Sequence, residues 1–375
     1  MRTPVDLGEA PPQALFDGAL GLSLSTGVPL RLHGPIAGAD AALVLAAAKL
    51  GAAEGPGPLD ALRAQLGREG PLELQLPRPR AGLHLLELRE KGAVARALWT
   101  FAWPLALLGK PSQLRLEGPN HCEGSPTFHE LRLAWAPLAA RFGLEVKLEL
   151  LVAGFGAESG ELIAQLDPAP ALTPLHLVHR GLLRQVRLIA ASAGSHRESV
   201  EAAEEARRRL RAHGVIAEAE RVPLPQLNLA PSGLELRSRR YALTAVAEFE
   251  HTVVSASALG PSREVPALLR EGALPESEGL ESPPPGERVA ERLARFLACS
   301  AAIEARTAER MLLPALLCAA GLGARAGTPP SCHFTTSEVT DGLLSLATLA
   351  RKLLPVRAVV DGVAGEEGVV VAAPL

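Results

Sequence analysis

A pattern that recurs three times along the chain constrains its fold more than any other feature. Each recurrence combines strand-like alternation of apolar residues, a turn with glycine or proline, a helix rich in alanine and leucine, and further strands. The first recurrence spans 5–77, with helices expected at 15–26 and 40–50, and the second begins near Gly82. Strands and helices that alternate in this way predict an α/β protein in which sheets pack against helices.

The second recurrence shows the periodicity most clearly. A helix is expected at 92–108, and a further helix at 128–142 lies between strands at 113–117 and 144–152. The apolar residues of that further helix follow the i, i+3, i+4, i+7 spacing of a buried face: Leu131, Ala134, Trp135 and Leu138. Gly143 follows at the C-cap position, where we expect the helix to end.

The third recurrence is split. Its strand near 175–178 and its helix at 286–298 are separated by a long segment with elements of its own. That segment predicts strands and one helix in the order strand, helix, strand, strand, strand: 182–190, 199–213, 215–221, 234–237 and 242–249. A polar stretch rich in proline and glycine, 272–286, reads as a connector. We therefore expect a small α/β insert, with one continuous α+β domain and a loose loop as the alternative.

Composition excludes several classes of protein. The 375 residues are 47% hydrophobic and 21% charged, which suits two or three globular units. The net charge of −3 gives no overall attraction for nucleic acid, so a polyanion would need a local basic surface. Only 3% of the residues are aromatic, which argues against a surface of many stacking rings.

Targeting and cysteine patterns indicate a cytoplasmic protein. The first residues have no apolar signal-peptide core, and the longest apolar run, 97–109, is too short to span a bilayer and contains Pro104. We therefore expect a soluble protein with no membrane partner. The four cysteines show no metal-binding spacing, and Cys332 is expected to be a small buried neighbour of His333.

A short string near the C-terminus offers a candidate nucleophile. His333 follows a glycine and proline turn and stands among small hydroxyl residues in Pro330-Ser331-Cys332-His333-Phe334-Thr335-Thr336-Ser337. Neutral imidazole attacks phosphorus, and its ordinary pKa leaves it mostly unprotonated at cellular pH. Taken alone, the string favours a hydrogen-bonded structural histidine over a catalytic one.

The string and its surroundings resemble the RNA 3'-terminal phosphate cyclase family. Its C-terminal signature is matched by 331–337, a helix and Leu354-Pro355-Val356-Arg357. Four further segments resemble the family in the same order along the chain: 118–129, 154–161, 178–181 and 305–314. This collinearity covers almost the whole sequence and is more specific than any single motif.

The resemblance implies a fold and a domain plan. Three β-α-β-α-β-β repeats are expected, with a smaller α/β domain inserted in the third. The repeats and the start of the third would occupy 1–181, the insert 182–275, and the remainder with His333 would occupy 276–375. The active groove is expected between the insert and the repeats, where His333 would meet Glu9 and Glu309.

The resemblance also implies a reaction. The family uses ATP and Mg²⁺ or Mn²⁺ to convert an RNA 3'-phosphate into a 2',3'-cyclic phosphate through a histidine-bound AMP, a ligase-type reaction of RNA processing. His333 stands at the position of that nucleophile, and Glu9 is the candidate metal ligand. The residues that the resemblance assigns to the nucleotide are Gln13, His121, Arg180, Glu309 and Arg310.

The N-terminal loop departs from the family pattern. Glu9 and Gln13 keep their register, whereas family glycines are replaced by Ala10, Pro11 and Pro12. Because proline has no N–H to offer a phosphate and its φ is restricted, this segment cannot form the family's glycine cradle.

Charged positions depart from the pattern as well. Phe16 or Asp17 stands where the family has one arginine, and a second arginine is missing in the stretch that ends at Asp40. The family's Asp-Gln pair is Glu309-Arg310 here. Two interpretations remain: an active cyclase with a remodelled groove, or a relative that has lost the reaction and binds RNA or protein.

Other basic or metal-binding candidates have structural alternatives. The arginines of 207–211 follow several glutamates and fit a solvated helix face, and those of 237–240 fit a charged strand edge. His121 and His129 could ligate a metal, but without a nearby third ligand a structural role is favoured.

Overall fold

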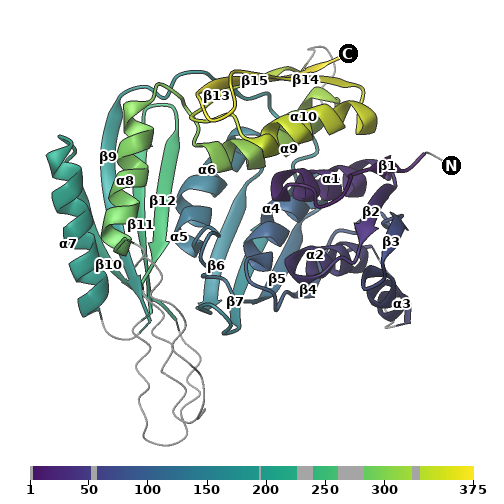
Figure 1. Ribbon diagram of the computed structural model, residues 1–375, viewed down its shortest axis with the longest axis horizontal. Coiled ribbons are helices and arrows are strands. Elements are labelled where there is room, and N and C mark those ends of the chain that lie inside the picture. The colour runs from purple at the N-terminus through teal and green to yellow at the C-terminus, as the bar shows by residue number, and fades with distance from the viewer. Residues whose placement is uncertain (1–2, 52–56, 194–195, 226–239, 261–282, 323–329) are drawn as a thin grey trace, which may run out of the picture.

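The computed structural model describes residues 3–51, 57–193, 196–225, 240–260, 283–322 and 330–375. Within these ranges the chain forms four sheets with helices packed against them, as the α/β prediction requires. Figure 1 shows the N-terminal and C-terminal ends on the same side, with the sheet β9–β12 and its two helices on the opposite side.

The first sheet has the order β1-β2-β3. Strand β1 (Val5–Asp6) is parallel to β2 (Leu30–Gly34), which is antiparallel to β3 (Gly70–Leu74). Helices α1 (Gln13–Thr26), α2 (Gly38–Lys49) and α3 (Gly57–Leu66) connect them. The helices predicted at 15–26 and 40–50 are confirmed with shifts of two residues or fewer at each end.

The second sheet has the order β4-β5-β7-β6. Its strands are β4 (Leu83–Glu87), β5 (Ser112–Gly118), β6 (Val146–Val152) and β7 (Gly160–Leu166), and only the pair β4 and β5 is parallel. Helix α4 (Ala93–Ala106) joins β4 to β5 and is buried at every position, so it lies at the centre of the fold.

The helix predicted at 128–142 is interrupted. It consists of α5 (Phe128–Glu130), a π-helical turn η1 (Leu131–Trp135) and α6 (Ala136–Arg141). Thr127 caps it through the backbone N–H of Glu130, whose carboxylate in turn accepts from the N–H of Thr127. The predicted apolar face is nonetheless buried.

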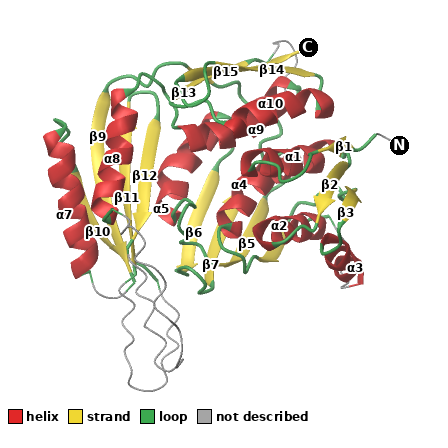
Figure 2. Cartoon of the chain, viewed as in Figure 1, coloured by secondary structure: helices red, strands yellow, loops and turns green. Residues whose placement is uncertain are grey.

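The third sheet has the order β14-β15-β13-β8. Its strands are β8 (His176–Leu177), β13 (Cys332–Thr336), β14 (Val356–Asp361) and β15 (Gly368–Pro374), and only β8 and β13 are parallel. Helices α9 (Ala305–Ala319) and α10 (Asp341–Leu353) lie along one face of this sheet, below it in the view of Figure 2. The second and third sheets share one pairing order, in which a parallel pair at one edge is followed by two antiparallel pairs.

The fourth sheet has the order β10-β9-β11-β12. It contains β9 (Leu183–Ser192), β10 (Glu218–Pro223), β11 (Tyr241–Phe249) and β12 (Val253–Leu259), with α7 (Arg197–Ala212) and α8 (Pro285–Ala298) against it. Strand β12 was not predicted, and the strand predicted at 234–237 lies outside the described residues, as does most of the connector at 272–286.

Helix α8 is the main difference from the predicted domain plan. The sequence pattern assigned it to the third recurrence, after an insert that ended at 275. Its buried side chains Val289, Leu293 and Phe296 instead share a hydrophobic core with α7 and strands β9, β11 and β12. Helix α8 packs there because its buried residues form one apolar stripe, and this stripe contacts the apolar face of the fourth sheet.

Two glycines bring α1 close to its neighbours. A Cβ on Gly18 would lie 2.5 Å from Leu346 of α10, and one on Gly21 would lie 2.7 Å from Leu313 of α9. Helix α1 therefore packs directly against both helices of the third sheet, which places its first turn beside α9.

A small hydrophobic cluster joins the second and fourth sheets. Phe155 and Ala153 pack there with Ile189, Ala191 and Val246. A buried hydrogen bond of 2.9 Å between the hydroxyls of Thr127 and Thr244 crosses the same boundary. No helix in the described ranges is both long enough and apolar enough to cross a membrane.

Candidate functional site

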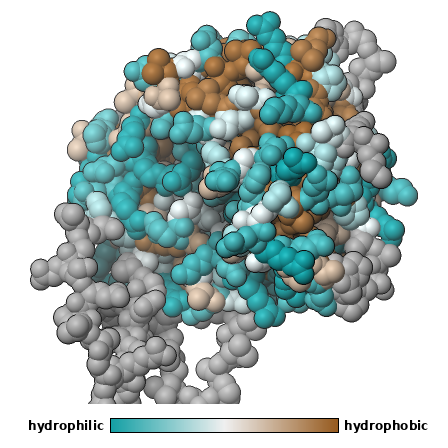
Figure 3. Space-filling view, turned by 45° about the vertical axis from the view of Figure 1, so that its right-hand side comes forward, coloured by the Kyte–Doolittle hydropathy of each residue, from teal (hydrophilic) through white to brown (hydrophobic). Residues whose placement is uncertain are grey.

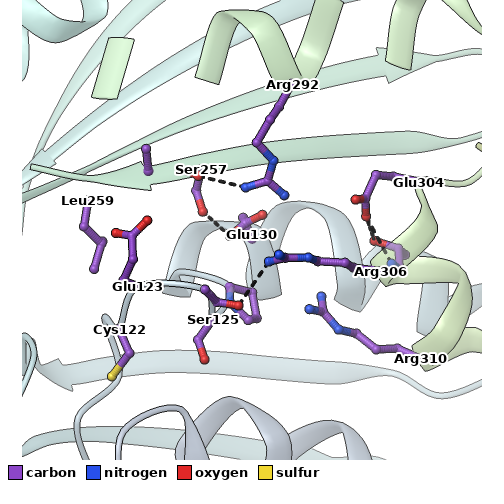
Figure 4. A pocket seen from close by; sticks show the side chains of 14 residues that line it. Cys122, Glu123, Ser125, Glu130, Ser257, Leu259, Arg292, Glu304, Arg306 and Arg310 are labelled. Carbon is purple, nitrogen blue, oxygen red and sulfur yellow. Dashed lines mark hydrogen bonds between the residues drawn. The ribbon is translucent and has the colours of Figure 1, made fainter. Parts of the chain in front are cut away.

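A cavity lies where the fourth sheet and α8 face α9, and we call it the arginine cavity. Its lining comes from the loop 122–126, Glu130, the end of β12, Arg292 of α8 and the first turns of α9. Figure 4 shows Arg292, Arg306 and Arg310 directed into it from two different helices.

The outer surface on one side of the molecule is mainly hydrophilic, with hydrophobic residues gathered toward the top of the view in Figure 3.

A second cavity, the Trp99 cavity, adjoins the first and has a volume of about 230 Å³. It shares Gly124, Arg306 and Arg310 with the arginine cavity. The start of α1, Trp99 and Thr100 of α4, and Gly342 of α10 complete its wall. Three of the five residues predicted to bind the nucleotide line this cavity together: Gln13, Glu309 and Arg310.

The arginines around these cavities form no ion pair with the carboxylates that the structure describes. Within the described part of the chain, no carboxylate oxygen lies within 4 Å of the guanidinium nitrogens of Arg292, Arg306 or Arg310. Arg292 donates to the Ser257 carbonyl at 3.1 Å, and Arg306 donates to the Gly124 carbonyl at 3.1 Å. Arg310 lies over the Trp99 ring, with its Cζ 4.1 Å from the ring centre.

Nearby carboxylates are engaged by neutral donors. Glu130 accepts from the N–H of Thr127 and from the hydroxyl of Ser257. Glu304, the N-cap of α9, accepts from the N–H of Thr307 at 3.1 Å. Glu309 accepts from the hydroxyl of Thr340 at 2.6 Å, and burial raises the pKa of its carboxyl. Because these donors are neutral, the carboxylates keep their charge, but in the described residues none of them lies within 4 Å of the three guanidinium groups.

Arg310 is the least solvated of these cations. Burial lowers the pKa of its guanidinium, and the more distant carboxylates of Glu130, Glu304 and Glu309 oppose that effect. A buried cation without a hydrogen-bonded anion is costly. An anionic ligand in either cavity would therefore lower the free energy of this arrangement.

The N-terminal positions that lack the family's arginines carry a buried ion cluster instead. Arg96 of α4 donates to Asp17 at 2.6 and 3.0 Å and to Asp40 at 2.6 Å. Although burial opposes it, the charges of the two aspartates raise the pKa of Arg96. Asp17 also accepts from the indole N–H of Trp99 at 3.3 Å. The cluster sets two carboxylates against one guanidinium, so it offers no free cation to a phosphate.

The predicted metal ligand Glu9 lies apart from these cavities. It is exposed and lines a separate hollow with Pro11, His33 and Asp40. Among the described residues, no group of three or more histidine, cysteine, aspartate or glutamate side chains is placed to hold a metal ion. Magnesium is commonly bound by one or two carboxylates together with substrate phosphates. The hollow contains two carboxylates, Glu9 and Asp40, and Asp40 is already paired with Arg96.

His333 does not meet Glu9 or Glu309, contrary to the expectation from sequence. Cys332 and Phe334 are fully buried and face α9, and Cys332 lies beside Cys318 of that helix. Because side chains alternate along a strand, His333 lies on the opposite face of β13, next to His176 of β8. Its half-buried ring has no hydrogen-bond partner among the described residues.

His121 is enclosed rather than presented to a ligand. It is fully buried, stacks on Phe155 at 4.7 Å, and its Nδ1 lies 2.8 Å from Oδ1 of Asn120. Burial, with a smaller contribution from His129, lowers the pKa of His121 to about 3. Burial likewise lowers the pKa of His129 to about 4, so both rings are neutral in the fold.

Arg180 is held by backbone groups and rings. Its guanidinium donates at 2.9 Å to the carbonyls of Phe296 and Leu297, and lies over the rings of Phe249 and Phe296. These contacts join the C-terminal end of α8 to the segment between β8 and β9, in which Arg180 lies. They occupy the Arg180 guanidinium, and its predicted contact with a nucleotide stays a prediction.

The basic patches singled out by sequence are also accounted for. Arg207, Arg208 and Arg209 of α7 form ion pairs with Glu204, Glu205 and Glu287, which fits the solvated face. Arg240 pairs with Glu158 at 2.7 Å. Arg237 and Arg239 lie outside the described residues.

Sequence reasoning missed three residues that shape the cavities: Trp99, Arg292 and Arg306. Only Arg306 left a usable signal, because it stands four residues before Arg310 on the same helix and thus on the same face. Arg292 lies far from both in sequence, and Trp99 resembles any other apolar residue of the buried helix α4.

Comparisons of the sequence with known proteins identify a family. The family model for RNA 3'-terminal phosphate cyclase matches residues 73–360. An RNA 3'-terminal phosphate cyclase of Pseudomonas fluorescens is 29% identical over 349 residues, which cover 90% of this chain and 89% of that protein. One from Methylococcus capsulatus is 30% identical, covering 68% of this chain and 66% of the relative. The chain belongs to the RNA 3'-terminal phosphate cyclase family.

Proposed function

We propose that this protein is an ATP-dependent RNA 3'-phosphate cyclase, a ligase-type enzyme of RNA processing, with His333 as its nucleophile. The relatives that match most of the chain carry the name of this activity. The single observation that carries the assignment to His333 is its half-buried ring, which has no hydrogen-bond partner among the described residues. It stands within the string that matches the family's C-terminal signature.

In the proposed reaction, a ring nitrogen of His333 attacks the α-phosphorus of ATP. A nitrogen–phosphorus bond forms, and pyrophosphate leaves. An oxygen of the RNA 3'-phosphate then attacks the same phosphorus and releases the histidine, which gives an RNA–AMP anhydride. The neighbouring 2'-hydroxyl attacks the RNA phosphorus, loses its proton and expels AMP, which closes the 2',3'-cyclic phosphate.

The Trp99 cavity is the proposed nucleotide-contacting region. Gln13, Glu309 and Arg310 meet there. Bound Mg²⁺ or Mn²⁺ would neutralise phosphate charge, and the hollow with Glu9 and Asp40 supplies carboxylates of the kind such ions prefer. His121 and Arg180 are not included, because their polar groups are enclosed or already engaged.

We also propose that the first three sheets are tandem repeats and that the fourth sheet is an insert in the third. The matching strand order of the second and third sheets supports this plan. The packing of α8 extends the proposed insert beyond 275, to about the end of that helix at Ala298.

A second candidate function is RNA binding without cyclisation. It is favoured by the Asp17–Arg96–Asp40 cluster, which stands where the family has phosphate-binding arginines and leaves no cation free for a phosphate. It is also favoured by the position of His333 on the face of β13 opposite to α9.

Conversion of a defined RNA separates the two functions. An RNA that ends in a 3'-phosphate is incubated with protein, ATP and Mg²⁺ or Mn²⁺ and then treated with phosphatase. The cyclase yields an end that resists phosphatase, requires ATP, and is not formed by the His333→Ala variant. Salt-sensitive RNA binding without any resistant product would support the second function.

A further inference from the structure

Three guanidinium groups converge on one cavity from two parts of the molecule. Arg292 comes from α8, which packs on the fourth sheet, whereas Arg306 and Arg310 come from α9 beneath the third sheet. Arg306 and Arg310 stand one helical turn apart and face the same side. The convergence therefore depends on how the fourth sheet sits against the rest of the chain.

The local charges favour an anion in this cavity. Of its three carboxylates, Glu123 is paired with Arg288, whereas Glu130 and Glu304 accept from neutral donors and keep their charge, so three guanidinium groups face two carboxylates. The three guanidinium groups each have at most a carbonyl or a ring as partner in the described part of the chain. Guanidinium N–H groups that lack an anion are suited to receive one in a bidentate manner.

The size and lining of the cavity restrict the ligand. Its volume is about 100 Å³, whereas drug-sized ligands occupy roughly 300 Å³ or more. The described residues that line it include no aromatic ring on which a base could stack. Hydroxyl groups of Ser125, Ser257 and Thr307 add further polar atoms to the wall. A single tetrahedral oxyanion fits these properties, and a nucleoside does not.

We propose that Arg292, Arg306 and Arg310 form a binding site for the terminal 3'-phosphate of an RNA strand. The choice of RNA as the bearer of the phosphate rests on the proposed function. A terminal monoester carries more negative charge than an internal diester, so a cavity in which three arginines outnumber the unpaired carboxylates distinguishes it from the rest of the strand. The adjoining Trp99 cavity leaves room for a second group beside the phosphate.

The test compares two RNAs that differ only at the 3' end. Short strands labelled at the 5' end and carrying either a 3'-phosphate or a 3'-hydroxyl are titrated in the absence of ATP, and binding is followed by fluorescence anisotropy. We expect the wild-type protein to bind the phosphorylated end about tenfold more tightly or better. Arg306→Gln and Arg310→Gln should each reduce that preference to about threefold or less.

Matched variants make the result specific. Arg211→Gln removes one exposed positive charge from α7, outside the cavity, and should leave the preference unchanged. Arg306→Lys keeps the charge but loses the fork, so an intermediate preference is expected. Thermal melting of each variant shows whether it is folded, and Arg306 and Arg310 are tested separately so that one unstable variant does not decide the outcome.

Equal binding of the two RNAs by the wild-type protein would overturn the proposal, as would a preference that survives both glutamine substitutions. His333→Ala separates the site from the reaction. If that variant keeps the preference while the wild-type protein makes no cyclic product, the proposed enzyme fails and the phosphate site stands. If the wild-type protein forms the cyclic product but binds both RNA ends equally, the proposed enzyme stands and the phosphate site fails.

Discussion

Arg96 and Arg310 both lie near Trp99, but their charges have different partners. Arg96 is hydrogen-bonded to Asp17, which also accepts from the Trp99 indole, and to Asp40. Arg310 lies over the indole ring, without a carboxylate within 4 Å in the described residues. Arg96 is buried and Arg310 is half-buried. The difference in partners indicates that Arg96 supports the fold, and Arg310 is the residue that we propose for a ligand.

The contrast also explains why charge totals mislead at this site. The family pattern predicted a loss of phosphate-binding positive charge near Asp17 and Asp40. The structure shows that both aspartates accept hydrogen bonds from the Arg96 guanidinium. The cavity arginines without an ion pair among the described residues lie on other helices: Arg292 on α8, and Arg306 and Arg310 on α9. A buried charge supports binding only when no neighbour already satisfies it.

The largest effect is expected from removing Arg96. Arg96→Leu leaves Asp17 buried without its cation, and we expect a loss of about 3–5 kcal/mol in the free energy of unfolding. Urea denaturation followed by circular dichroism measures it. Arg310→Gln is the matched control, since it removes a cation without a paired carboxylate and should cost about 1 kcal/mol or less.

A double substitution sharpens the same comparison. Arg96→Leu combined with Asp17→Leu removes both partners of the buried pair, so much of the lost stability should return. If Arg96→Leu alone unfolds at the urea concentration of the wild-type protein, the cluster does not hold the fold as described.

A smaller, pH-dependent effect is expected from the buried histidines, which are accommodated by staying neutral. Their folded pKa values of about 3 for His121 and about 4 for His129 lie below the unfolded value of about 6.5. The unfolded chain therefore binds protons first, and stability should fall as pH drops from about 6.5 toward 4. The slope is at most about 1.4 kcal/mol per pH unit for each histidine.

The variant His129→Gln should reduce that slope, as measured by urea denaturation at a series of pH values. His213→Gln, at the exposed end of α7, is the control and should leave the slope unchanged. An unchanged slope in His129→Gln would mean that this ring is protonated in the fold, against its buried environment.

Local pattern was enough to predict most elements, because helix periodicity and strand alternation are short-range properties. The helices at 15–26 and 92–108 are examples. The interruption at 131–135 and the docking of α8 were missed, since both depend on partners far away in the sequence. Strand β12 was missed although it alternates, because its small residues Ser255, Ala256 and Ser257 carry a weak hydrophobic signal.

The candidate site was predictable only in part, for the same reason. Gln13, Glu309 and Arg310 were named because they match a family pattern, and the fold brings them to one cavity. Neither the partners of Arg96 nor the position of Arg292 can be read from a linear pattern, because each depends on contacts between different sheets. The expected meeting of His333 and Glu309 was wrong because strand alternation sends the ring to the other face of β13.

The most direct measurement of the central claim is covalent labelling of His333. The protein is incubated with ATP labelled at the α-phosphate and with Mg²⁺ or Mn²⁺, and is then separated by denaturing electrophoresis. The account predicts a labelled band whose bond is lost in acid and survives alkali, as expected of a phosphoramidate. His176→Ala, on the neighbouring strand, should label like the wild-type protein, and His333→Ala should not. Equal labelling of wild type and His333→Ala, or no labelling of either, would contradict the account.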